Sequence, residues 1–219
     1  RGRERQRRSS EESKSEQVRG ETPQVTGRSR IMDKAIATVR TASTTAAVPL
    51  RAAASPVIRV IGFAALIALG SQVRIPVPGT DVPMTLQLLA VLLTGFLLPW
   101  KEAAGCVGLY LGIGSIGLPV FTSGSAGVFG PTGGYLIGFL PAAFLIAALR
   151  GSGFLRMTLV GAAGIALVLA CGVIGRMIWL AGDESLALST GFWPFWPKAL
   201  VELAVAVTLV RAVRTGRDD

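Results

Sequence analysis

The sequence predicts an all-α membrane protein, a bundle of about six transmembrane helices with both termini in the cytoplasm. The 219-residue chain is 51% hydrophobic and only 16% charged, with a mean hydropathy of +0.56. Apolar runs recur from residue 56 to residue 213, each about long enough to cross ~30 Å of hydrocarbon. Residues 86–98 and 155–175 lack the amphipathic alternation with which a soluble helix faces water. These features favour a multi-pass protein of the cell membrane.

The apolar runs define six expected helices. They are placed at residues 56–73, 83–99, 102–118, 131–149, 155–181 and 194–213. The segments beside one face carry the basic residues Arg51, Arg59, Lys101, Arg150, Arg156, Arg211, Arg214 and Arg217. The alternate loops carry Asp81, Asp183 and Glu184 instead. Because basic residues concentrate in cytoplasmic loops, an even number of spans with both termini inside accommodates this pattern.

Residues 1–55 form a basic N-terminal extension with few large apolar residues. Such a composition buries too little surface to offset ordering entropy, so we expect disorder there. Met32 is a candidate start site, and an Arg- and Ser-rich transit peptide is an alternative interpretation of this segment. The helical domain then spans residues 56–213, and residues 214–219 form a charged tail.

The composition also excludes several function classes. The net charge of +9 does not indicate a nucleic-acid partner, because the arginines are not interleaved with aromatics and no binding motif accompanies them. The chain has no histidine, and its cysteines, Cys106 and Cys171, both fall within expected helices, so we predict no disulfide, metal site or cofactor. No nucleophile–base pair or metal cluster is evident, which argues against an enzyme.

Small residues recur at four-residue spacing, as in Gly108-x-x-x-Gly112, residues 130, 134 and 138, and Ala64-x-x-x-Ala68. This spacing lets helix backbones approach closely in lipid. We expect most of the glycines to serve packing within the chain. Ala64 and Ala68 lie on a helix that a partner, or a second copy of the chain, can use.

Two loops on the outer side are candidates for ligand binding. Residues 74–87 contain three prolines that force an extended path before a polar pair, and residues 118–136 combine a Ser/Gly run with a helix start. Such loops can fold over a small ligand. The candidate hydrogen-bonding residues are Thr85, Gln87, Tyr110, Ser123, Thr132 and Tyr135. Trp193, Phe195 and Trp196 are candidates for an apolar wall, or for an aromatic belt at the membrane interface.

Three basic residues lie on the outer half against the general charge pattern: Arg74, Arg176 and Lys198. An anionic ligand arriving from outside is one reason for them. Two alternatives remain open. Lys198 and Glu202 stand four residues apart and can neutralise each other, and Arg176 can extend its charge toward the interface.

Three motifs carry a resemblance to a known family. Residues 77–95 (VPGTDVPMTLQLLAVLLTG), 108–121 (GLYLGIGSIGLPVF) and 130–139 (GPTGGYLIGF) closely resemble, in order, those of the BioY family, the biotin-binding S components of energy-coupling-factor (ECF) transporters. The resemblance implies a six-helix bundle that binds biotin near the outer face. It also implies that Ala64 and Ala68 dock the transmembrane T component, and that ATP is hydrolysed by separate ATPase subunits. The absence of a G-x-x-x-x-G-K-[ST] motif agrees with this.

The last helix departs from the family pattern. Members usually carry Pro-Phe, then Gly-Asp and a Lys about three residues later, in a segment thought to contact the ligand. Here Ala199 stands in place of the acid and Glu202 in place of the lysine. Lys198 is the nearby cation, displaced by about one helical turn. With Arg74 it completes the predicted ligand-binding set.

A standalone channel or proton-coupled carrier is the alternative function. Such a protein needs an ionisable residue near the middle of the membrane, and Glu202 is the candidate.

Overall fold

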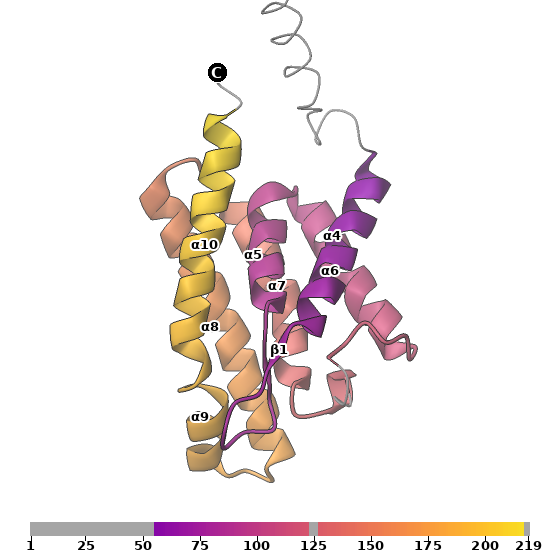
Figure 1. The fold of residues 1–219 in the computed structure, drawn as a ribbon, viewed down its shortest axis with the longest axis vertical. Coiled ribbons are helices and arrows are strands. Elements are labelled where there is room, and N and C mark those ends of the chain that lie inside the picture. Colours follow the sequence, from indigo (N-terminus) through magenta and orange to yellow (C-terminus); the bar gives the residue numbers. More distant parts are fainter. Residues whose placement is uncertain (1–54, 123–126, 217–219) are drawn as a thin grey trace, which may run out of the picture. The chain divides into compact units, whose positions relative to one another are not determined.

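The computed structural model describes residues 55–122 and 127–216. In this part of the chain, six long helices form a bundle: α4 (Pro56–Gln72), α5 (Gln87–Leu97), α6 (Trp100–Ser115), α7 (Gly133–Leu149), α8 (Phe154–Trp179) and α10 (Phe195–Thr215). Successive long helices alternate in direction, so the start of α4 and the end of α10 lie at the same end, the upper one in Figure 1. The prediction of a mostly helical bundle is confirmed. The predicted extension at residues 1–55 and Ser123 fall outside the described residues, apart from Ser55.

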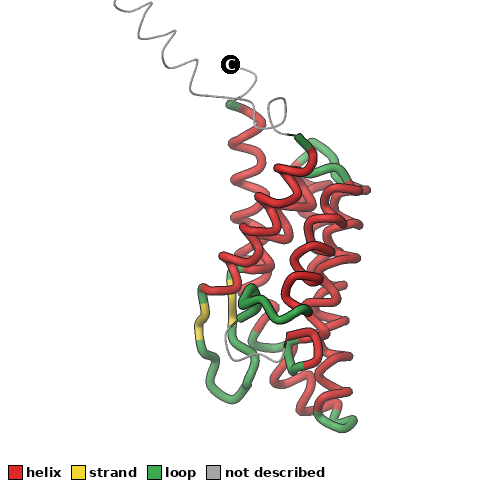
Figure 2. The backbone as a smooth tube through the Cα atoms, turned by 90° about the vertical axis from the view of Figure 1, so that its right-hand side faces the viewer, coloured by secondary structure: helices red, strands yellow, loops and turns green. Residues whose placement is uncertain are grey.

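Short elements gather at the lower end of the bundle. They are β1 (Arg74–Ile75), β2 (Met84–Thr85), the 3-10 turn η1 (Gly127–Phe129) and the short helix α9 (Glu184–Gly191). Figure 2 shows both strands and most of the irregular segments at this end. The strands pair antiparallel, with Arg74 opposite Thr85. Residues 74–85 therefore form a β-hairpin, which we call the hairpin below.

The second long helix is shorter than the sequence predicts. We expected it to begin at residue 83, but α5 begins at Gln87 because Met84 and Thr85 pair with β1. The backbone nitrogen of Leu86 donates to the oxygen of Gly70 at 3.1 Å, which holds the hairpin against the end of α4. At its other end α5 stops before Leu98, whose extended backbone is the conformation preferred before proline.

Helix α9 was not predicted, because we assigned its capping residue Asp183 to a loop. The side chain of Asp183 accepts a hydrogen bond from the backbone nitrogen of Leu186 at 3.0 Å and so caps α9. This hydrogen bond, with a further one from the Ser185 hydroxyl, lowers the pKa of Asp183. The cap is therefore charged at neutral pH.

The core is built around α5, which packs against α4, α7 and α10. Its side chains Val91, Leu92 and Phe96 are completely buried. An all-round apolar helix of this kind has to be enclosed by others. The five remaining long helices surround it.

Helices α7 and α8 share the most extensive helix–helix contact of the described bundle, and glycines permit it. A β-carbon at Gly134 would lie 2.3 Å from the backbone oxygen of Cys171, so only glycine fits there. The expectation of internal packing is correct for Gly134 and Gly138. It is wrong for Gly108 and Gly112, where an added β-carbon would meet no atom within 4 Å.

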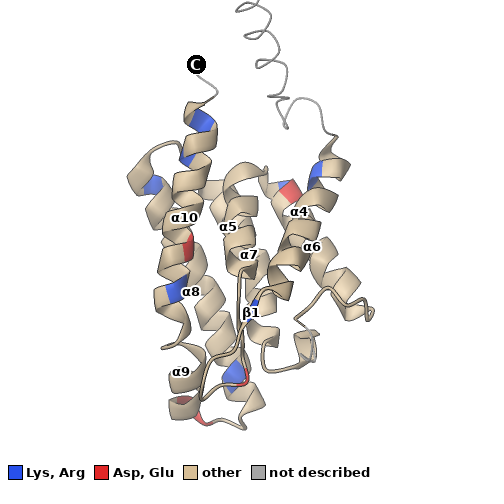
Figure 3. Ribbon diagram, viewed as in Figure 1, with Lys and Arg blue, Asp and Glu red and all other residues tan. Residues whose placement is uncertain are grey.

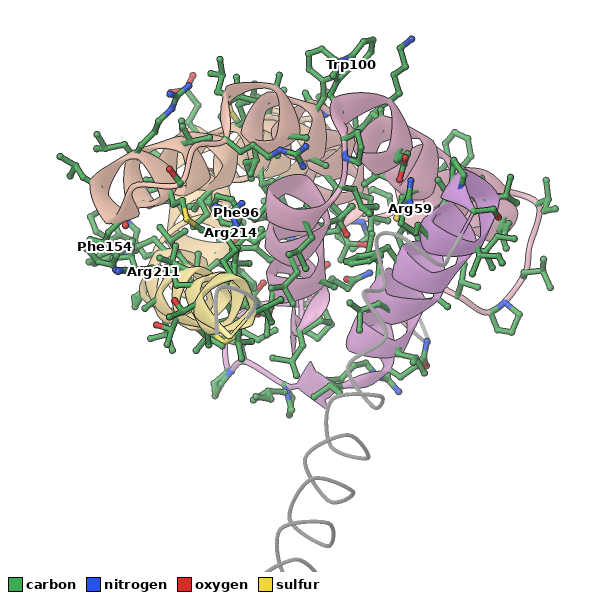
Figure 4. The ribbon with its side chains drawn as sticks, turned by 90° about the horizontal axis from the view of Figure 1, so that it is seen from above. Arg59, Phe96, Trp100, Phe154, Arg211 and Arg214 are labelled. Carbon is green, nitrogen blue, oxygen red and sulfur yellow. The ribbon has the colours of Figure 1, made fainter. Side chains whose placement is uncertain are left out.

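Basic side chains gather at the upper end of the bundle, as the coloured segments of Figure 3 show. Arg59 makes two contacts to the Glu102 carboxylate, at 2.7 and 2.9 Å. Seen from above in Figure 4, Arg214 reaches toward Phe96, and its Nη2 donates to the Phe96 backbone oxygen at 3.3 Å. Arg211 lies over the Phe154 ring at 5.4 Å from the centroid. These arginines thus tie the helix ends together as well as carrying charge.

Of the described helices, α8 is the one that is both long and apolar enough to cross a membrane. Helices α4, α5 and α7 are apolar but shorter. The bundle nevertheless exposes many large apolar side chains, far more than scattered surface residues of a soluble protein. They include Val57, Ile61, Leu69, Phe154, Leu155, Leu159, Ile178, Trp179, Val201 and Val213.

Candidate ligand-binding site

A pocket lies at the lower end of the bundle, between the hairpin and helices α5, α7, α8 and α10. The empty space between its lining side chains and across its open mouth is about 640 Å³. Its apolar lining consists of Val82, Pro83, Leu88, Phe121, Leu136, Phe139, Val168, Leu169 and Phe195. Its polar lining consists of Thr85, Gln87, Thr122, Thr132, Tyr135 and Lys198. A mainly apolar wall with a few polar groups suits a ligand that has both an apolar part and polar groups.

Thr85 and Gln87 belong to a chain of hydrogen bonds. The Thr85 hydroxyl donates to the Gln87 amide oxygen at 3.0 Å, and the Gln87 amide nitrogen donates to the Tyr110 hydroxyl. Tyr110 is 1% exposed and lies behind Gln87 rather than in the pocket lining. Its role here is to hold the Gln87 amide in one orientation.

Thr132 is different, because its buried hydroxyl has no hydrogen-bond partner among the described residues. It precedes α7, where Gly133 packs so tightly that an added β-carbon would lie 2.0 Å from the Val128 oxygen. This contact fixes the turn that presents Thr132 to the pocket. A buried hydroxyl without a partner is costly, so a ligand group is the natural partner for it.

Lys198 brings positive charge to the pocket wall. Its ammonium lies 2.9 Å from a carboxylate oxygen of Glu202, one turn further along α10. The structure thus contains the neutralising pair that the four-residue spacing suggested. The Glu202 side chain is 5% exposed and that of Lys198 is 21% exposed, so the lysine is the member that reaches the pocket.

Arg176 joins the hairpin to α8 and α9. It is 2% exposed, so the suggestion that its charge extends to the interface is wrong. One guanidinium nitrogen donates to the Asp81 carboxylate of the hairpin, and the other donates to the Thr190 hydroxyl at 2.7 Å. Beside it, the Tyr135 hydroxyl donates to the Gly191 oxygen. These contacts hold the hairpin in place next to the pocket mouth.

The structure brings most of the predicted ligand residues together. Thr85, Gln87, Thr132, Tyr135 and Lys198 line one pocket. Arg74 lies on an exposed strand of the hairpin and is not among the lining residues. Ser123 belongs to residues 123–126, which the structure does not describe. Of the three aromatic candidates, Phe195 lines the pocket, whereas Trp193 and Trp196 face outward.

Apart from Phe195, sequence reasoning missed the apolar lining, notably Leu136, Phe139, Val168 and Leu169. In sequence these residues look like any buried helix positions. A usable signal existed only for Phe139, which follows Tyr135 by four residues and so shares its helix face.

The described residues contain no group of acidic, histidine or cysteine side chains able to hold a metal ion. Cys106 and Cys171 are both free thiols within helices. The site therefore consists of hydrogen-bonding groups, one ammonium and apolar walls.

This fold and site define a class: helical bundles that enclose a small molecule at one end beneath a loop. The chain belongs to the BioY family, whose sequence profile matches residues 39–219. It is 37% identical over 152 residues to the "Biotin transporter BioY" of Thermotoga maritima, covering 67% of this chain and 88% of that protein. It is also 37% identical over 175 residues to the "Biotin transporter BioY" of Rhodobacter capsulatus, covering 71% and 90%.

A solved structure supports the same assignment. The fold is similar to the crystal structure of an "S-component for biotin from an ECF-type ABC transporter", with a TM-score of 0.66 and 26% sequence identity. The match covers 73% of this chain and 90% of that one.

Proposed function

We propose that this chain is the S component of an ECF-type vitamin importer and captures biotin at the outer face of the cell membrane. The observation that carries the proposal is the pocket, which unites an unpartnered Thr132 hydroxyl, the Lys198 ammonium and an apolar wall. Biotin has a polar ureido ring, an aliphatic chain and a carboxylate. Each of these parts has a matching group in the lining. The relatives named as biotin transporters support transport rather than catalysis.

The direct test is calorimetric titration of the detergent-purified protein with biotin. Biotin amide and lipoate serve as comparison ligands. Tight binding of biotin together with weak binding of lipoate is the expected result. No heat of binding with biotin would overturn the proposed substrate.

Lys198→Ala tests where the carboxylate lies. Burying a carboxylate requires a cation or several donors nearby, and Lys198 is the ammonium in the lining. We expect biotin affinity to fall by ~10-fold to ~100-fold, or ~1.4 to ~3 kcal/mol for a charge-assisted contact. Binding of the amide should change much less. An equal loss for acid and amide would place the carboxylate elsewhere.

The proposed membrane arrangement is multi-pass, with six spans and both ends in the cytoplasm. Its support is the apolar surface of the bundle and the basic residues at its upper end. In that orientation the pocket opens to the outside.

The proposed partners are a transmembrane T component and ABC-type ATPase subunits, with the first helix as the docking site. Ala64 is buried and Ala68 half-buried, and both line an apolar groove between α4 and α6 with Ile61 and Ile113. Small residues in such a groove admit an approaching helix.

Ala68→Leu fills this groove, and Ala68 is not among the residues that line the biotin pocket. We expect uptake by cells that express all the subunits to fall severalfold while biotin binding by the purified protein is unchanged. Ala204→Leu, on the exposed face of α10, is the matched control. Normal uptake with Ala68→Leu would remove the docking role.

The second candidate is a standalone proton-coupled carrier, which the buried Glu202 favours. Biotin uptake by liposomes containing this chain alone distinguishes the two. The importer proposal expects little uptake until the partner subunits are added.

A further inference from the structure

Lys198 connects the pocket to a buried acid that the proposed function leaves unused. Its ammonium lines the pocket and also lies 2.9 Å from the Glu202 carboxylate. Glu202 itself is 4% exposed and is not part of the pocket lining. The Lys198 ammonium therefore contacts both the ligand pocket and the buried Glu202 carboxylate.

Glu202 has few other means of stabilising its negative charge. The backbone of Leu89 approaches its carboxylate, and Lys198 is the charged group that pairs with it. Helices α5 and α7, which face the same part of the bundle, carry no charged residue. On α8 the charged residues are Arg156, whose side chain donates to the Leu149 oxygen, and Arg176, which pairs with Asp81.

The remaining charges on α10 itself are distant. They are Arg211 and Arg214, which follow Glu202 by nine and twelve residues, or about 13 and 18 Å along a helix. Among the described residues, Lys198 is thus the cation on which a charged Glu202 depends.

A carboxylate ligand competes for that cation. When it engages Lys198, two carboxylates share one ammonium, and the site carries one excess negative charge in surroundings of low polarity. An uncompensated buried charge of this kind is usually removed by protonation. Water at the pocket mouth stabilises the charge of the ligand carboxylate, whereas Glu202 is buried. Glu202 is therefore the group to be neutralised.

We propose that Glu202 takes up one proton when a carboxylate ligand binds Lys198, so that capture of an anionic vitamin by this chain is coupled to protonation. The proton comes from solvent, Glu202 becomes a neutral carboxylic acid, and Lys198 retains its proton and its charge. Glu202 is then a positioning residue, holding the lysine at the pocket wall until the ligand replaces it. This inference rests on the proposed function, because it takes biotin as the anion.

The test is calorimetric titration of the full chain with biotin at pH 7 in phosphate, HEPES and Tris. These buffers differ in ionisation enthalpy, so the dependence of the observed heat on the buffer gives the number of protons bound. We expect uptake of about one proton, and an affinity that falls by up to about tenfold per pH unit above neutrality. Zero uptake by the wild-type protein, with biotin bound tightly, would overturn the proton coupling and leave the proposed substrate intact.

Two comparisons assign the proton to Glu202. Glu202→Gln should bind biotin with no proton uptake and a flat pH profile, whereas Glu184→Gln, an exposed position on α9, should retain the wild-type uptake. Proton uptake that persists in Glu202→Gln would overturn the assignment.

Biotin amide, which brings no negative charge to Lys198, should bind the wild-type protein without proton uptake. This acid–amide comparison decides the question even if the glutamine variant does not fold, and failure of biotin to bind the wild-type protein at all would instead refute the proposed function.

Discussion

The Thr132 hydroxyl is the polar group of the pocket most clearly left for a ligand. The hydroxyls of Thr85 and Tyr135 both donate within the protein, and that of Thr122 donates to the Ser71 oxygen at 3.2 Å. Thr132 lines the same cavity with a buried oxygen that has no partner among the described residues. A ligand that hydrogen-bonds to the Thr132 hydroxyl gains the energy of that bond. It also removes the energetic cost of leaving the buried hydroxyl without a partner.

Thr132→Val isolates that contribution, because valine keeps the shape and removes only the hydroxyl. We expect biotin affinity to fall by about 3-fold to 10-fold, corresponding to one hydrogen bond of ~0.5 to ~1.5 kcal/mol. The melting temperature in detergent should not fall, because the variant loses no hydrogen bond within the protein. Calorimetry and thermal unfolding measure the two effects.

Thr122→Val is the control within the same pocket. Its hydroxyl already bonds to the Ser71 oxygen, so this change should lower the melting temperature more than the affinity. If Thr132→Val binds biotin as tightly as the wild-type protein, the hydroxyl is not a ligand contact.

At this scale the sequence predicted the polar lining better than the apolar one. Thr85, Gln87 and Thr132 stood in recognisable motifs, and all three line the pocket. Phe139 and Val168 were not predicted, because an apolar residue that faces a cavity has the same periodicity as one that faces the core. Only the spatial arrangement of α7 and α8 separates the two cases.

At the scale of elements, the hairpin is the part that sequence patterns identified least well. Prolines at its tip indicated an extended path, but the pairing of β1 with β2 depends on contacts with α4 that no local pattern encodes. The same holds for its attachment to α8. Arg176 and Asp81 are 95 residues apart in sequence, and their pairing follows from the fold.

The two side chains of the Arg176–Asp81 ion pair differ greatly in solvent exposure. The Arg176 side chain is 3% exposed and that of Asp81 is 53% exposed. Removing Asp81 therefore leaves the Arg176 guanidinium buried, with the Thr190 hydroxyl as its remaining side-chain partner among the described residues. The hairpin loses an attachment while the bundle beneath it retains its core.

Asp81→Ala should accordingly release bound biotin faster. We expect the dissociation rate to rise by about tenfold, the equivalent of ~1.4 kcal/mol, with a smaller change in the association rate. Release of radiolabelled biotin after dilution into unlabelled ligand measures it. Glu184→Ala removes an exposed carboxylate from the same end of the molecule and should release biotin at the wild-type rate. Identical rates in the two variants would show that the hairpin does not retain the ligand.

At the scale of the whole molecule, hydrophobic runs and the prolines at their boundaries predicted the helices well. The starts of α4, α8 and α10 lie within one residue of the expected positions. Local composition suffices there because each helix is apolar enough to need burial or lipid on every side. The short helix α9 was missed although its Asp183 cap is readable, because the charged pair at residues 183–184 was taken as loop.

The distribution of charge supports one orientation of the bundle in the membrane. Most basic residues are gathered at the end that holds the start of α4 and the end of α10. Arg74, Arg176 and Lys198 lie toward the pocket end, together with the acidic Asp81, Asp183 and Glu184. Since basic residues remain in the cytoplasm, the pocket end should face outward. The thiol reactivity of engineered cysteines checks this directly.

The experiment begins from a variant in which Cys106 and Cys171, both free, are replaced by alanine. Leu118→Cys introduces an exposed thiol near the pocket end, and Thr215→Cys introduces one at the opposite end. In intact cells a membrane-impermeant maleimide should label Leu118→Cys and not Thr215→Cys. After permeabilisation both should react, which controls for thiol accessibility. Labelling of both sites in intact cells would require an even number of spans between them instead of three, and labelling of Thr215→Cys alone would invert the proposed topology, so that the pocket faced the cytoplasm.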